Sequence, residues 1–343
     1  MPKQRENGIR RRNATVPPGH NPFFTLAKKL CIPDVIPEVA KLRRPVDGAV
    51  RLALISMPDV SYVEKDFKWR KALPSGVHEE DVRRTLAAVS HADSKRMLVA
   101  FREALLFAVE EGNANIVCVS ELGLPSRDAV PLQEAQQIAF EISCKHNALI
   151  IAGSSHDSRT MFNTGYLFHP TEKRATWAFH KNASAHKMGE RIMTPARRRV
   201  LIVDAFDLRI ATMICLDVVD YTTLASVMAA GDQVDVVLVP SYTLRFEKMQ
   251  DVATVASQAL PGVVALVNAR LPVGSSFIAQ CGVEIKLPAP SVLPGGAEVA
   301  LLSLKIDELK EKRTQAKNDL HPYLDWMFGN RYIPRDLQGP RRF

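Results

Sequence analysis

One segment of the 343-residue chain combines a buried-strand pattern with a candidate nucleophile: Asp207-Leu208-Arg209-Ile210-Ala211-Thr212-Met213-Ile214-Cys215-Leu216-Asp217. Residues 208–214 form a largely apolar run, which is typical of a strand covered on both faces. The run ends at a cysteine, and residues 220–230 then have the pattern of a helix. We therefore expect Cys215 to lie on a sharp strand-to-helix turn at the edge of a sheet.

The Cys215 thiol has two interpretations. Free cysteines are most often small buried hydrophobes. At the start of a helix, however, backbone amides can lower the pKa of a thiol and bind a developing oxyanion. This segment alone favours the first interpretation, so the choice depends on the residues at the ends of the other strands.

The composition is that of a soluble globular protein, with 46% apolar and 24% charged residues. No apolar run reaches the length of a membrane span, and no apolar segment follows the basic N-terminus as in a secretory signal. The five cysteines are widely spaced and include no Cys-x-x-Cys pair. We therefore expect a protein of the reducing cytoplasm with no membrane association, disulfide framework or metal site.

Seven of the eight net positive charges come from the two ends of the chain. Residues 1–12 carry a net charge of +4, and residues 327–343 carry +3. The body is close to neutral, so the basic residues belong to tails rather than to a groove that would bind nucleic acid.

The pattern of strands and helices predicts an α/β protein with mixed sheets. Residues 1–49, rich in Pro, Arg and Lys, are expected to form a mostly irregular arm. The main domain is expected over residues 50–305, with a polar insertion at 59–92. Residues 306–343 are expected to form a charged helix and a basic tail.

Three chemically useful groups follow three expected strands. Glu121 follows the strand at 116–119, Lys181 follows the strand at 174–180, and Cys215 follows the strand at 208–214. Reacting groups of α/β proteins gather beyond the carboxyl ends of strands. A thiol nucleophile needs a base for its proton and a cation or donor for the oxyanion, and these residue types meet both needs.

With these three groups, the sequence resembles the nitrilase, or carbon–nitrogen hydrolase, superfamily from about residue 50 to about residue 305. Three segments are similar to the family's general-base, lysine and nucleophile motifs, in the family's order: Val119-Ser120-Glu121, Phe179-His180-Lys181 and Ile214-Cys215-Leu216-Asp217. Weaker similarities involve Glu190, Asn163 and the segment Pro240-Ser241-Tyr242. The chain departs from the family at Ser120, where proline is usual, and at Asn182-Ala183, where His-Leu is common.

The resemblance implies a four-layer αββα sandwich that pairs into homodimers or higher homo-oligomers and needs no cofactor. It implies hydrolysis of a non-peptide C–N bond in a small amide, carbamoyl compound or nitrile, of amidase type rather than true nitrilase. Cys215 would form a thioester or thioimidate, and Glu121 would act as the base. Lys181 and the Leu216 backbone N–H would hold the oxyanion, and Glu190 and Asp217 would support the site.

Other interpretations remain open from the sequence alone. Glu121 could cap a loop, Lys181 could be a solvated charge, and Glu190 could pair with Arg191 at the surface. Asp217 is expected to brace the turn rather than to react. An acyltransferase with the same mechanism is one alternative function. Another is a nitrilase-like binding or regulatory module whose basic arms contact a partner or nucleic acid.

Overall fold

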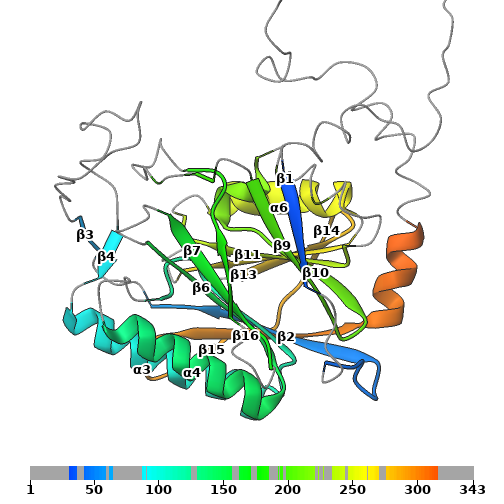
Figure 1. Ribbon diagram of the computed structural model, residues 1–343. Coiled ribbons are helices and arrows are strands. Elements are labelled where there is room, and N and C mark those ends of the chain that lie inside the picture. The colour runs from blue at the N-terminus through cyan, green and yellow to red at the C-terminus, as the bar shows by residue number, and fades with distance from the viewer. Residues whose placement is uncertain are drawn as a thin grey trace, which may run out of the picture.

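The computed structural model describes residues 31–36, 42–58, 62–64, 87–89, 91–124, 130–156, 162–170, 176–184, 192, 194–195, 198–220, 223, 227, 234–243, 246–260, 262–269 and 276–315. The expected basic ends of the chain and most of the expected insertion and of the helix at 220–230 lie outside these residues. Within the described residues, two seven-stranded mixed sheets face one another (Figure 1). The first sheet has the order β1-β9-β10-β11-β12-β13-β14, and the second has the order β15-β16-β2-β5-β6-β7-β8.

The strands of the first sheet are β1 (Cys31–Ile36), β9 (Arg198–Ala205), β10 (Leu208–Thr212), β11 (Val236–Ser241), β12 (Val263–Asn268), β13 (Ser276–Gln280) and β14 (Val283–Ile285). Those of the second are β2 (Ala49–Ser56), β5 (Ile116–Val119), β6 (Leu149–His156), β7 (Asn163–Phe168), β8 (Thr176–His180), β15 (Ser291–Val292) and β16 (Glu298–Lys305).

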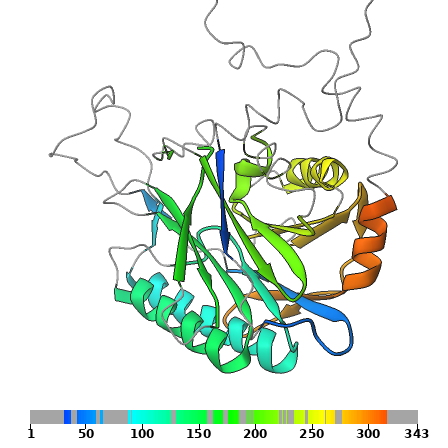
Figure 2. The ribbon, with the colours of Figure 1, turned by 45° about the vertical axis from the view of Figure 1, so that its right-hand side comes forward.

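Helices cover the outer faces of both sheets. The helices α3 (His91–Leu106) and α4 (Val130–His146) pack on the second sheet, and α3 continues as the π-helix η1 (Phe107–Glu111). The helix α6 (Phe246–Ala259) packs on the first sheet. Figures 1 and 2 show α3 and α4 on one side of the sheets and α6 on the other. The expected four-layer αββα sandwich is thus confirmed.

Alternation along each strand explains the three apolar layers. In β5, Ile116 and Cys118 face the layer between the sheets, whereas Val117 and Val119 face the helices. Because successive side chains of a strand point to opposite faces, an almost continuous apolar run fills two layers at once. Each fully buried Leu, Ile or Val stabilises the fold by roughly 1.5–3 kcal/mol relative to an exposed one.

The N-terminal segment contributes more order than expected. Residues 31–36, within the arm expected to be mostly irregular, form β1 and pair in parallel with β9 from Arg198 to Val203. Leu42 is fully buried between the sheets, and its carbonyl accepts the Phe206 N–H at 2.7 Å. Residues 31–36 are therefore a strand within this arm, because a preformed sheet edge supplies hydrogen bonds that local propensity does not predict.

Part of the expected insertion is ordered. Its strands β3 (Tyr62–Glu64) and β4 (Ala87–Val89) pair as a separate two-stranded sheet. No helix among the described residues is both long and apolar enough to cross a bilayer.

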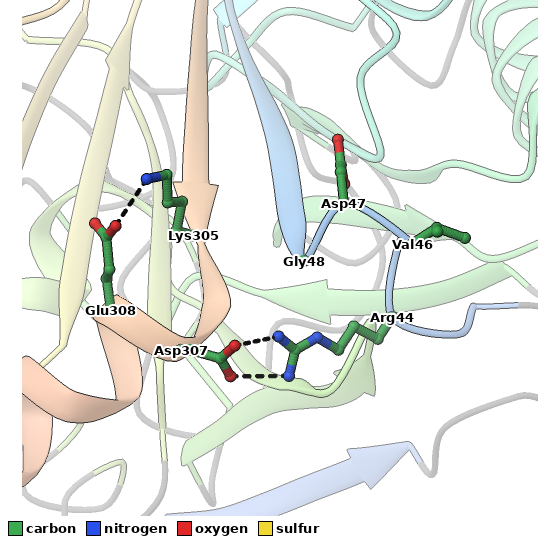
Figure 3. Close-up of a pocket in the computed structure, with 7 residues that line it drawn as sticks. All are labelled: Arg44, Val46, Asp47, Gly48, Lys305, Asp307 and Glu308. Carbon is green, nitrogen blue, oxygen red and sulfur yellow. Dashed lines mark hydrogen bonds and ion pairs between the residues drawn. The ribbon is translucent and has the colours of Figure 1, made fainter.

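The helix at 306–315 joins both sheets at one end of the sandwich. It continues directly from β16, and its Arg313 pairs with Asp235 just before β11. Lys310 pairs with Asp207 at 2.7 Å, and Arg44 makes two hydrogen bonds to Asp307 (Figure 3). These ion pairs attach the charged C-terminal helix to the body.

His169 is a buried polar group that none of the described residues satisfies. It follows β7, is fully buried beside Trp177, and neither ring nitrogen has a hydrogen-bond partner among the described residues. Burial lowers the pKa of His169 to about 4, because the charged imidazolium would be desolvated. The unfolded chain therefore takes up a proton at this residue before the folded protein does.

We predict that His169→Phe stabilises the protein and reduces its sensitivity to acid. In the wild type, stability should fall as the pH drops from about 6.5 towards 4, because only the unfolded state gains the proton in this range. Urea unfolding at pH 7.5 and pH 5 should show a gain of about 1 kcal/mol or more at pH 7.5 and a larger gain at pH 5. An equal gain in stability at both pH values would contradict a lowered pKa of His169 in the folded protein.

Candidate active site

Glu121 and Lys181 form a buried ion pair just beyond the ends of β5 and β8 in the second sheet. The Lys181 Nζ donates to Glu121 Oε1 at 2.7 Å, and each side chain is only 2% exposed. Asn163 Nδ2 donates to the same oxygen at 2.8 Å. The Tyr242 backbone N–H, from the end of β11 in the other sheet, donates to Oε2 at 2.9 Å. The carboxylate therefore joins both sheets.

The position of Glu121 depends on a tight turn and on a bulge in the neighbouring strand. The turn is closed by the Gly123 N–H, which donates to Ser120 O, and Leu122 has a positive φ of 56°. The register of β6 shifts between Ile151 and Ser154, and Ser154 Oγ accepts the Leu122 N–H. Bulges of this kind occur beside active sites because they redirect the chain.

Ser120 is a departure from the family pattern that the structure explains. Its N–H donates to Ile55 O at 2.9 Å, a hydrogen bond that proline cannot make. Its Oγ accepts the Met57 N–H at 3.2 Å. Ser120 thus ties the Glu121 turn to the end of β2 by two hydrogen bonds.

Strand alternation directs Lys181 into the space between the sheets. Trp177 and Phe179 pack against the inter-sheet cluster, and Lys181 is the next residue on the same face. Its N–H donates to Asn163 O at 2.9 Å, which prolongs the β7–β8 ladder. The residue is buried, so the alternative of a solvated loop charge does not describe it.

Cys215 lies buried in a tight turn after β10. The strand ends at Thr212, and Cys215 begins the short 3₁₀-helix η3 (Cys215–Val218) with a φ of 48°. The first hydrogen bond of the turn runs from the Asp217 N–H to Ile214 O. The Leu216 N–H therefore precedes the bonded part of the turn and has no acceptor within it.

Asp217 connects the Cys215 turn to the residues after Lys181. Its Oδ1 accepts the backbone N–H groups of Asn182 at 2.8 Å and Ala183 at 2.7 Å, and its Oδ2 accepts the Ile214 N–H at 3.2 Å. Burial raises the pKa of Asp217 to about 7, whereas Lys181 and the three N–H donors oppose this increase. The Asp217 side chain thus bonds both the turn and the residues after Lys181.

The structure thus gathers Glu121, Lys181 and the Cys215 turn at one end of the sandwich. Glu190 lies outside the described residues. From the sequence, Asn163 and Tyr242 were recognisable only as family similarities, and the Gly153–Ser154 bulge was missed. The signal for the bulge was a glycine inside an apolar strand pattern.

Comparisons with solved structures show the same architecture. The chain matches a carbon–nitrogen hydrolase superfamily protein from Xanthomonas campestris with a TM-score of 0.54 and 15% identity, over 83% of this chain and 99% of that one. It matches Nit3 of Saccharomyces cerevisiae, a member of branch 10 of the nitrilase superfamily, with a TM-score of 0.55 and 14% identity, over 81% and 96%. The chain has the nitrilase-superfamily fold.

An amidase from Nesterenkonia sp. AN1 is also similar to this nitrilase-fold chain. The TM-score is 0.54 at 14% identity, over 80% of this chain and 98% of that one, in a structure with acrylamide. No family model matches the sequence, and no curated protein matches it. The likeness is therefore one of fold.

Two other features of the described residues were considered as centres of chemistry, a metal cluster and the surface cleft beside Arg44. Among the described residues, no group of three or more His, Cys, Asp or Glu side chains is arranged to hold a metal ion. A cleft of about 330 Å³ lies beside Arg44 and Lys305 (Figure 3). These two cations pair with Asp307 and Glu308 respectively, so the cleft offers little unpaired charge to a ligand.

We predict that Gly153→Ala displaces Glu121 and impairs the site. Gly153 has a φ of 78°, and an added Cβ would clash with the backbone oxygen of Ser120. The backbone strain costs about 1 kcal/mol, and the clash adds to it because backbone atoms cannot easily move aside. Alkylation of Cys215 by iodoacetamide should slow by about tenfold or more if the base moves by a fraction of an ångström.

Gly282→Ala is the matched control. Gly282 has a φ of 82°, but an added Cβ would meet only the Gln258 side chain, at 3.4 Å. This variant should lose a similar amount of stability to strain while alkylation of Cys215 keeps its wild-type rate. Equal alkylation rates in the two variants would show that the bulge does not position the site.

We predict that Lys181→Met destabilises the fold more than the double variant Glu121→Gln/Lys181→Met. The single change leaves a buried carboxylate without its cation, which typically costs about 3–5 kcal/mol. The double change removes both charges at nearly constant volume. Chemical unfolding of the wild type, both single variants and the double variant gives the coupling energy, and additive effects would mean that the two charges do not interact.

Proposed function

We propose that the protein hydrolyses a non-peptide C–N bond in a small amide, carbamoyl compound or nitrile, with Cys215 as the nucleophile. The observation that carries this proposal is the buried Glu121–Lys181 pair, tied through Asn182 and Asp217 to the cysteine turn. A base, a cation and a thiol on one structural unit are the parts that thiol-dependent acyl transfer needs.

The hydrogen bonds of Glu121 favour Oε2 as the oxygen that takes the thiol proton. Oε1 already accepts from Lys181 and Asn163, and a carboxylate oxygen has two lone pairs. Among the described residues, Oε2 accepts only from the Tyr242 N–H, so one lone pair remains for the proton. Glu121 Oε2 thus acts as the general base while the Cys215 sulfur attacks the carbonyl or nitrile carbon.

Lys181 and the Leu216 N–H hold the negative charge that develops on the substrate oxygen, or on the nitrogen of a nitrile. Lys181 stays aligned because Glu121 binds it, and the Leu216 N–H has no acceptor within its own turn. A preformed donor of this kind contributes on the order of 10²–10³ in rate. The donors cost no reorganisation during the reaction because the fold already positions them.

Two further steps form the thioester and then hydrolyse it. Protonated Glu121 gives its proton to the departing ammonia or amine as the tetrahedral intermediate collapses. Glu121 then takes a proton from water as the water attacks the thioester, and the acid and the free thiol are released. With a nitrile, the first covalent species is a thioimidate.

The solved neighbours support amidase-type chemistry. A mutant of the Nesterenkonia amidase has the acetamide moiety of fluoroacetamide added covalently at its active-site cysteine. Another mutant of that enzyme was solved with butyramide. We further propose that this protein is a cytoplasmic homo-oligomer, and sedimentation analysis of the purified protein would test its oligomeric state.

We predict that fluoroacetamide adds its acetamide moiety to Cys215 and that Cys215→Ala abolishes both the adduct and turnover. The nucleophile is then absent, so activity on a panel of amides, nitriles and carbamoyl compounds should fall by on the order of 10³-fold or more. Intact-mass and peptide mass spectrometry measure the adduct, and ammonia release measures turnover.

Cys144→Ala is the control, because Cys144 is an exposed cysteine outside the site. It should keep both the Cys215 adduct and the activity of the wild type. An adduct that stays with Cys144 and is absent from Cys215 would refute the nucleophile assignment.

A further inference from the structure

We propose that Asp217 is a positioning residue that holds the nucleophile turn against the lysine segment, and that it does so only as a carboxylate. The inference rests on the proposed function in taking Cys215 as the nucleophile. Asp217 is buried, and it acts through the segments that carry Lys181 and Cys215.

Every polar contact of the Asp217 side chain with the described residues comes from a hydrogen-bond donor. Oδ1 accepts the N–H groups of Asn182 and Ala183, and Oδ2 accepts the Ile214 N–H. The Asn182 Nδ2 lies 3.4 Å from Oδ2, at the long end of a hydrogen bond. Asn182 immediately follows Lys181, and Ile214 immediately precedes Cys215. Because Asp217 bonds both, it sets the distance between the Lys181 cation and the Cys215 thiol.

Asn182 also connects Asp217 to strand β9. Its Nδ2 donates to Arg199 O at 2.9 Å, and its Oδ1 accepts the Arg199 N–H at 3.0 Å. The side-chain amide therefore pairs with β9 as another peptide group would. This gives a physical role to the asparagine that stands where the family's histidine is common.

A protonated Asp217 does not fit this arrangement. A carboxylic acid has an O–H donor, whereas the four groups around Asp217 are themselves donors. Taking up a proton must therefore break or lengthen at least one of these contacts. The link between the lysine segment and the cysteine turn loosens when that happens.

The charges around Asp217 come from few elements. Lys181, at the end of β8, is the cation that interacts with it, and Glu121 lies one step further, bonded to Lys181. Cys215 and Asp220 are the titratable groups in and just after its own turn, and β9 contributes the backbone of Arg199. Burial nevertheless raises the pKa of Asp217 to about 7, so the side chain gains its proton as the pH falls below neutrality.

The test is the pH dependence of Cys215 alkylation by iodoacetamide, followed by peptide mass spectrometry in full-length protein. In the wild type, the rate constant should fall as the pH drops through about 7, beyond the fall expected from thiol ionisation alone. Asp217→Asn should lower the rate constant at pH 8 by about 10- to 100-fold, because an amide N–H replaces an acceptor. Asp217→Asn should also leave only the fall in the alkylation rate constant that thiol ionisation causes.

Asp204→Asn is the matched control, since Asp204 bonds Arg209 on the first sheet, away from the turn. It should keep the wild-type rate and profile. An Asp217→Asn profile that keeps the additional fall would overturn the proposal even if its rate were lower, because a purely structural role changes the rate and not the titration.

Asn182→Ala gives a second test, should Asp217→Asn fail to fold. This variant removes one weak donor to the carboxylate and the anchor to Arg199. Fewer donors to the charged form raise the pKa of Asp217, so the additional fall should move to higher pH. An unmoved profile would overturn the proposal.

The outcome is separable from that of the proposed function, because alkylation needs no turnover. A protein that hydrolyses no compound but shows these profiles contradicts only the proposed function. A protein that hydrolyses a substrate through Cys215, with an Asp217→Asn profile like the wild type's, contradicts only the positioning role.

Discussion

The buried pair of Lys181 and Glu121 is the interaction on which the rest of the site depends. Removing two charges from water costs several kcal/mol per ion, and close contact offsets this only when the other lone pairs are also used. Here Asn163 and the Tyr242 N–H supply those further bonds. The pair is therefore a constraint, because neither charge can move without leaving the other desolvated and unpaired.

The same bonds determine how the two sheets align. Tyr242 belongs to the end of β11 and Glu121 to the end of β5, so one hydrogen bond spans the interface between the sheets. Asp217 makes a second crossing, from the turn after β10 to residues 182 and 183. Apolar packing between the sheets is non-directional and tolerates sliding, whereas these polar bonds define one alignment.

The order of elements was readable from the sequence because the strands are apolar on both faces and the helices are amphipathic. Glu121, Lys181 and Cys215 could be identified because each follows such a strand and because their order resembles a known family. Strand β1 could not be identified in this way, since its hydrogen bonds come from β9, which is far away along the chain. The bulge at Gly153 left only a weak signal, a glycine in an apolar strand pattern, because the Ser120 carbonyl that excludes a side chain there comes from a distant part of the chain.

The antiparallel pairing of β2 with β16 has a mechanical consequence. Ala49 lies opposite Lys305, and the chain enters and leaves this pair at the same end of the sheet. Tension between residue 42 and residue 315 would first load the Arg313–Asp235 and Lys310–Asp207 ion pairs of the C-terminal helix, and then the Arg44–Asp307 pair. It would then open the ladder bonds one after another, because they lie perpendicular to the strands and are loaded in series. Pulled from these two points, the sandwich would open by peeling β2 and β16 apart at modest force.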